Sequence, residues 1–169
     1  MADGSSLQGV MKELKMLSGE DAYAAAIDAV IGRAQRTLHI FDADLVHGDY
    51  GAVGRCAALG DFLSSGHSNR LDMVLHRTDF LVSRCPRLMQ LFRIHGHAFS
   101  IRQTFEHARA AADALIIADG LHYVHRFHQD APRFLLAFGD PEGARQMEVR
   151  FRQLFEASFP AVSATTLGL

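Results

Sequence analysis

The stretch Ala114-Leu115-Ile116-Ile117-Ala118-Asp119-Gly120 decides the fold class of this chain of 169 residues. Its first five residues form an uninterrupted apolar run of strand length. Asp-Gly is a preferred turn pair, and the stretch Tyr123–Phe127 after it is rich in strand-forming residues. The two segments therefore predict a β-hairpin that turns at Asp119 and Gly120.

Before this hairpin, predicted helices alternate with predicted strands. Glu20 and Asp21 begin a helix, because acids in a first turn interact favourably with the helix dipole. That helix carries a stripe of small apolar residues at helical spacing: Ala22, Ala25, Ala26, Ala29 and Val30. Further along, the pattern predicts strands over 37–41, 71–75 and 98–102, and helices over 52–65 and 87–94.

After the hairpin, a sixth strand is expected over 134–138, followed by a last helix. Asp140 is suited to the N-cap position and Pro141 to the first helical position, and the helix is expected to reach about Ser158. Strands that alternate with helices and end in a late hairpin predict an α/β domain with a mixed sheet flanked by helices.

We divide the chain into an N-terminal extension (1–18), one domain (19–160) and a C-terminal tail (161–169). The composition, 49% hydrophobic and 21% charged, is that of an ordinary globular domain. In the extension, apolar residues at helical spacing predict a short docking turn of helix: Val10, Met11, Leu14 and Leu17.

Charge and hydropathy exclude several classes of protein. The net charge of -2 gives no global basic field, so nucleic-acid binding would need a local basic patch. No apolar run is long enough to span a membrane, and the N-terminus lacks the pattern of a signal peptide. Cys56 and Cys85 have no CxxC partner and are expected to be reduced. These observations predict a cytoplasmic protein without a membrane span.

The order of these elements resembles one half of a phospholipase D-type domain. The resemblance covers about residues 20–158 and includes the last helix, where Phe151 to Ser158 resembles the FxxLWxxS pattern of that superfamily. The superfamily carries the motif HxKxxxxD on the strand that corresponds to Ala114–Ala118. Aligned on Asp119, the motif Lys corresponds to Ala114 and the motif His to Ala112. A Gly-Ser pair and an Asn that follow in the superfamily correspond to Arg126, Phe127 and Gln129.

The resemblance implies a degenerate catalytic motif. In the family reaction one His attacks phosphorus, a second His protonates the leaving oxygen, and the Lys stabilises charge on the phosphoryl oxygens. Ala112 and Ala114 supply neither a nucleophile nor a cation, and of the motif only Asp119 remains. We therefore expect no catalytic residue at the family positions, no cofactor and no metal.

Other polar residues offer a substitute site. Arg102 and Arg126 would form an anion-binding pocket if their strands adjoin, and His107, His125 or His128 would then replace the missing acid. The alternative is that these are solvated charges and a capping His. His122, His125 and His128 would point to different faces of a strand, which argues against a shared metal. For the acids after strand 37–41, a Mg²⁺ site and a turn both remain open: Asp42, Asp44 and Asp49.

Three functions are compatible with these observations. The first is a catalytically inactive phospholipase D-like domain, a pseudoenzyme that binds a phosphate-containing ligand, a nucleic acid or a protein. The second is a divergent phosphodiesterase or nuclease with a relocated His-based site, and the third is a pure protein-interaction domain. Active members of the resembled family build one site from two halves, so the resemblance also implies a possible homodimer.

Overall fold

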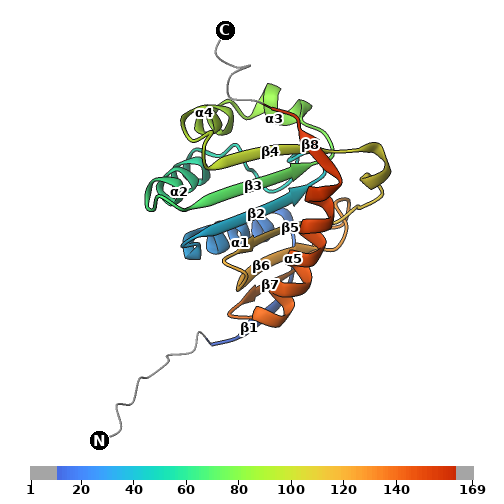
Figure 1. The fold of residues 1–169 in the computed structure, drawn as a ribbon. Helices are drawn as coiled ribbons and strands as arrows, with labels where there is room; N and C mark the ends of the chain where they lie inside the picture. The colour runs from blue at the N-terminus through green and yellow to red at the C-terminus, as the bar shows by residue number, and fades with distance from the viewer. Residues whose placement is uncertain (1–10, 163–169) are drawn as a thin grey trace, which may run out of the picture.

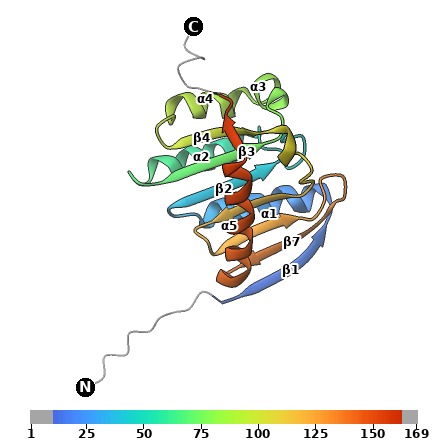
Figure 2. The same ribbon diagram turned by 45° about the vertical axis from the view of Figure 1, so that its right-hand side comes forward.

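An eight-stranded mixed sheet with helices on both faces forms the domain, in a computed structural model that describes residues 11–162 (Figures 1 and 2). The strand order is β1-β7-β6-β5-β2-β3-β4-β8. The strands are β1 (Glu13–Ser18), β2 (Thr37–Asp42), β3 (Arg70–Leu75), β4 (Phe99–Thr104), β5 (Ala114–Ala118), β6 (His122–Arg126), β7 (Arg133–Phe138) and β8 (Ser158–Pro160). The helices are α1 (Glu20–Arg33), α2 (Val53–Ser64), α3 (Asp79–Arg84), α4 (Pro86–Ile94), the 3-10 turn η1 (Glu106–Ala108) and α5 (Pro141–Glu156).

The predicted hairpin is confirmed as β5 and β6, which lie in the middle of the sheet. Asp119 and Gly120 both have positive φ angles, 56° and 62°, and the Leu121 N–H donates to the Ala118 carbonyl to close the turn. Asp and Gly tolerate this left-handed backbone better than most residues, which explains why the pair stands here. On its other side β5 pairs antiparallel with β2, and β2, β3 and β4 run parallel.

Two apolar layers enclose the sheet. Figure 1 shows α5 in front of the sheet and α1 behind it. Ile116 of β5 belongs to the core that includes α1, α2 and α4, whereas Leu115 belongs to the core beneath α5. Since successive strand residues point to opposite faces, a strand covered on both faces must be apolar throughout, as β5 is. The mixed α/β architecture expected from the sequence is thus confirmed.

Several local expectations were wrong or incomplete. Residues 13–18 form strand β1, paired with β7, and no helical turn; Leu14 and Leu17 face opposite sides of the sheet, and Val10 lies outside the described residues. A spacing of three residues fits a helix by itself, but pairing with an available sheet edge overrides so weak a signal. The helices α3 and η1 and the short strand β8 had no clear sequence signal. Ala25 of the predicted stripe is exposed, because the buried face of α1 is centred on Ile27 and Val30.

No helix among the described residues is long and apolar enough to cross a membrane.

Candidate functional site

The β5–β6 hairpin has two ends with different chemistry. We call the end with Ala112, Ala114 and Arg126 the motif end, because the alignment on Asp119 matches these positions with the motif of the resembled superfamily. We call the opposite end, with Asp119 and His122, the turn end. Ala114 pairs with Arg126 across the two strands, and Ala118 pairs with His122 at the other end.

At the motif end, Arg126 fills the space beside Ala114. Only 1% of Arg126 is exposed, and its Nη1 and Nη2 donate to Glu20 Oε2 and Oε1 at 3.0 and 2.7 Å. Its guanidinium also lies 4.8 Å from the centre of the Tyr23 ring. The hydrogen bonds from Arg126 lower the pKa of Glu20, and those to Glu20 raise the pKa of Arg126. The charge of Arg126 is thus already neutralised within the chain.

A second group lies on the α5 side of the motif end. Asp113 accepts from His125 Nε2 at 2.9 Å and from Arg150 Nε and Nη2 at 2.6 and 2.5 Å. Burial raises the pKa of Asp113, but these hydrogen bonds outweigh it and lower the pKa to about 2. Asp113 therefore stays ionised and fixes the His125 ring. The group lines an open hollow of about 350 Å³, whose remaining lining is Ala110, Ala111, Ala112 and Phe127.

The expected pocket between Arg102 and Arg126 does not exist. Strands β5, β2 and β3 separate β4 from β6, and the two side chains lie on opposite faces of the sheet. Arg102 donates to the hydroxyl and the carbonyl oxygen of Ser158 at 2.8 and 2.6 Å and lies over the Phe155 ring. The condition for this pocket, that the two strands adjoin, is not met, because β5 pairs with β2 and β6 and not with β4.

The remaining predicted residues do not converge either. His107 is exposed on η1 and stacks against Phe105. His128 lies beyond the end of β6, and its backbone carbonyl accepts from Arg126 Nε. Among residues 11–162, no three His, Cys, Asp or Glu side chains are grouped so that they could hold a metal ion. The acids after β2 make turn contacts: Asp42 Oδ1 accepts from the backbone of Asp44 and Leu45.

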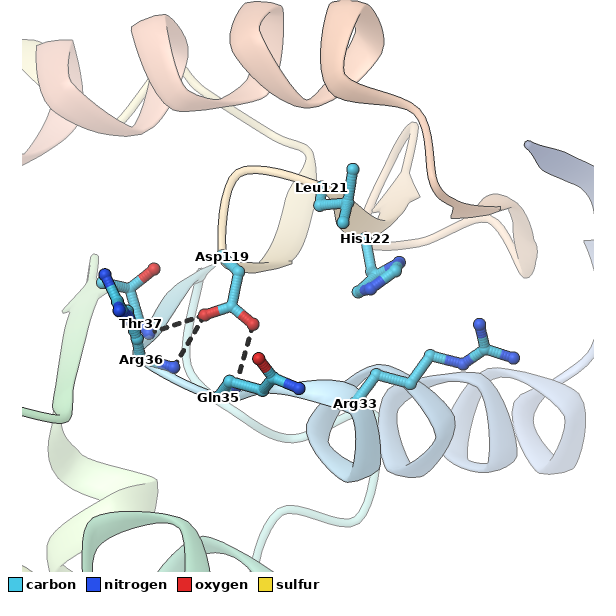
Figure 3. Close-up of a pocket in the computed structure, with 7 residues that line it drawn as sticks. All are labelled: Arg33, Gln35, Arg36, Thr37, Asp119, Leu121 and His122. Atoms are coloured by element: carbon cyan, nitrogen blue, oxygen red, sulfur yellow. Dashed lines mark hydrogen bonds between the residues drawn. The ribbon is translucent and has the colours of Figure 1, made fainter. Parts of the chain in front are cut away.

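At the turn end, Asp119 holds the segment that joins α1 to β2 (Figure 3). Its Oδ2 accepts from the Gln35 N–H at 2.8 Å, and its Oδ1 accepts from the N–H groups of Arg36 and Thr37 at 2.8 and 2.9 Å. The sequence had assigned Asp119 to a turn, which is correct. Its second role, as acceptor for three backbone N–H groups about 80 residues away, had no sequence signal.

Next to Asp119 lies a hollow of about 390 Å³ with an excess of hydrogen-bond donors. The guanidinium of Arg33 lies 3.7 Å from the centre of the Phe138 ring, and neither Arg33 nor Arg36 makes an ion pair within the described part of the chain. Asp119 is the one carboxylate in the lining, and its oxygens already accept three hydrogen bonds. The full lining is Arg33, Gln35, Arg36, Thr37, Asp119, Leu121 and His122.

His122 adds a neutral donor to this hollow. Its Nδ1 accepts from the Gly139 N–H at 3.0 Å, so the neutral ring carries its proton on Nε2. Burial, followed by the nearby charge of Arg33, lowers the pKa of His122. In Figure 3 its ring faces the side chain of Arg33 across the hollow. Nothing in the sequence singles out Arg33 or Arg36, because a basic residue such as Arg33 is common in the last turn of a helix, where it interacts with the helix dipole.

Comparison with known proteins identifies the family. The model of a domain of unknown function, DUF7931, matches residues 19–167. The chain belongs to the DUF7931 family. No curated protein sequence matches the DUF7931 chain.

Solved structures show that the DUF7931 domain has a phospholipase D-like fold. It is similar to Nuc from Salmonella typhimurium, a phospholipase D family member, with a TM-score of 0.66 and 12% identity over 90% of this chain and 100% of Nuc. It is also similar to NucT from Helicobacter pylori, with a TM-score of 0.56 and 11% identity over 89% of this chain and 99% of NucT. A third similar structure is that of TrmBL2, an archaeal chromatin protein with a novel mode of DNA binding. Its TM-score is 0.63, and the identity is 10% over 88% of this chain and 54% of TrmBL2. The resemblance inferred from the sequence is confirmed for the fold.

Proposed function

We propose that this DUF7931 domain is a non-catalytic phospholipase D-fold domain that binds a phosphate-containing ligand in the hollow at its turn end. One observation carries the proposal, namely the contrast between the two ends of the hairpin. The motif end has two alanines and an arginine neutralised by Glu20, whereas neither arginine at the turn end makes an ion pair in the described chain.

The motif end lacks the groups that phosphodiester cleavage by the family route needs. A nucleophile and a cation to stabilise charge on the phosphoryl oxygens would have to stand at Ala112 and Ala114. Losing one member of such a constellation already lowers rates by orders of magnitude. Arg126 cannot take over the cation's role without breaking its bidentate pair with Glu20 and leaving a buried charge unpaired.

The turn end has the properties of a phosphate site. Arg33 and Arg36 carry two positive charges against the one negative charge of Asp119, so the lining has a net positive charge. Arginine also presents several N–H donors in a planar fork that suits phosphate oxygens. The neutral His122 adds a further donor without adding charge. The volume of about 390 Å³ is within the range of small-ligand sites.

Calorimetric titration with adenosine monophosphate tests this proposal. We expect saturable binding to the wild type and at least a tenfold weaker affinity for the Arg33→Gln/Arg36→Gln double variant. Arg145→Gln is the matched control, because Arg145 is exposed on α5 and lines none of the hollows described above. A short single-stranded DNA should be titrated in parallel; a steeper dependence on salt for DNA would indicate that nucleic acid is the ligand. If neither probe binds, the proposal fails and a protein-interaction domain remains.

A second candidate function rests on the pair of His125 and Asp113. Asp113 holds the His125 ring through Nε2, which leaves Nδ1 to act as a base. The ring lines a hollow that also includes Ala112, the residue aligned with the motif His. A divergent phosphodiesterase would use His125 to activate water. Hydrolysis of bis(p-nitrophenyl) phosphate, with and without a chelator, tests it against His125→Ala and the control His107→Ala. Turnover that disappears only in His125→Ala would support this candidate and contradict a non-catalytic domain.

A further inference from the structure

Strand β1 presents an open edge at one side of the sheet. It pairs with β7 along Glu13–Ser18, and no described strand pairs with its outer side. The opposite edge strand, β8, has three residues and ends at Pro160, which has no N–H to donate. Of the two edges, β1 alone offers a row of backbone groups long enough for another strand to pair with.

The face of β1 on the α5 side is apolar and uncovered. Leu14 and Met16 each expose 49% of their surface, and Leu14 lies opposite Ala137, whose side chain packs under α5. Figure 2 shows α5 crossing the central strands while β1 runs at the rim of the sheet. Adding a strand beside β1 would remove both apolar side chains from water.

The other face of β1 carries charges in a self-complementary order. Glu13 and Lys15 are two positions apart and point to the same face, where Lys15 Nζ lies 2.9 Å from Glu13 Oε1. If a second copy of β1 pairs antiparallel with Leu14 opposite Leu14, then Glu13 of each copy lies opposite Lys15 of the other. The one exposed pair within each strand would thereby be replaced by two pairs between the strands, Glu13 of each copy with Lys15 of the other. In the same register Leu14 is diagonal to Met16 of the other copy, within reach of side-chain contact.

We propose that two copies of this chain associate through β1, in an antiparallel register centred on Leu14, to form one continuous sheet. A two-fold axis requires a surface patch that is complementary to itself. In this register the order Glu13-Leu14-Lys15 is self-complementary, because each Glu13 lies opposite a Lys15. Because the two copies of β1 run in opposite directions, the turn ends of the two domains lie at opposite ends of the strands of the joint sheet.

Light scattering coupled to gel filtration, over a range of protein concentrations, tests the interface. The wild type should be a dimer. Glu13→Lys and Lys15→Glu each place like charges opposite one another twice, and each should raise the dimer dissociation constant about tenfold or more. The Glu13→Lys/Lys15→Glu double variant restores opposite charges in the same register and should recover the dimer.

Two controls keep the result interpretable. Arg145→Glu makes a charge change of the same size on α5 and should leave the dimer unchanged. Both β1 side chains are about half exposed, so the single variants should keep the thermal midpoint of the folded monomer. A monomeric wild type at the highest concentration would overturn the proposal. So would single variants that remain dimeric, or a double variant that does not recover.

Discussion

Asp119 joins two segments of the fold that lie far apart in the sequence. Its two oxygens accept three backbone N–H groups and so attach the start of β2 to the end of β5. Alanine would remove all three acceptor contacts and would also occupy a left-handed backbone position, where φ is 56°. We predict that Asp119→Ala lowers the free energy of unfolding by about 2–4 kcal/mol.

Asp119→Asn is the matched control for that prediction. Asn keeps one acceptor oxygen and tolerates the left-handed backbone, so it should cost about half as much. Urea unfolding followed by circular dichroism measures both variants. Equal stability of the alanine variant and the wild type would contradict the role assigned to Asp119.

Asp42 is a buried carboxyl group whose ionisation opposes folding. Burial raises its pKa to about 6, above the value of an unfolded chain, in spite of two backbone hydrogen bonds. Because the folded state favours the protonated form of Asp42, this carboxyl group contributes most to stability below pH 4, and its contribution is lost as the pH rises through 6. Asp42→Asn keeps an acceptor oxygen and removes the charge. It should raise stability at pH 7 by about 1–3 kcal/mol and remove this loss between pH 4 and 6 in pH-dependent urea unfolding.

At the scale of elements, the ion pair between buried Arg126 of β6 and half-exposed Glu20 of α1 should respond unequally to the loss of either partner. Glu20→Gln leaves the guanidinium of Arg126 buried without a carboxylate and should cost about 2 kcal/mol, since the half-exposed site lets water compensate in part. Arg126→Met removes the charge and keeps much of the volume, so stability should change by less than about 1 kcal/mol. Urea unfolding of both variants measures the asymmetry; a larger cost for Arg126→Met would contradict it.

The same scale explains which elements could be predicted. Two elements depend on residues that are close in sequence and could therefore be predicted. One is the apolar run of β5 with its Asp-Gly turn. The other is the start of α5, where Asp140 Oδ1 accepts from the Gly143 N–H. Strands β1 and β8 exist because distant strands offer edges to pair with, β7 for β1 and β4 for β8. The residues of β1 and β8 carry no comparable local signal. From the sequence, β1 therefore falls in the N-terminal extension, and the last helix is expected to run to about Ser158, where β8 begins.

At the scale of the whole molecule, the sequence predicts which groups the motif end lacks but not where polar groups meet. The assignment of Ala112 and Ala114 to the motif positions rests on the alignment at Asp119 and stays a prediction. The hollow at the turn end is formed by the end of α1, the start of β2 and the hairpin turn, segments more than 80 residues apart. Its donors become visible only once the strand order is known. The strand order likewise decides that Arg102 and Arg126 do not share a pocket.

Phosphate binding at the turn end is tested most directly by a phosphate titration of the isotopically labelled protein, followed residue by residue through its backbone amide signals in NMR. We predict saturable shifts at the turn end, in Gln35, Arg36, Thr37 and the segment 120–122, and their loss in the Arg33→Gln/Arg36→Gln variant. Signals of the motif end, around Ala112 to Ala114 and Arg126, should stay in place. Shifts concentrated at the motif end, or no saturable shift at either end, would contradict it.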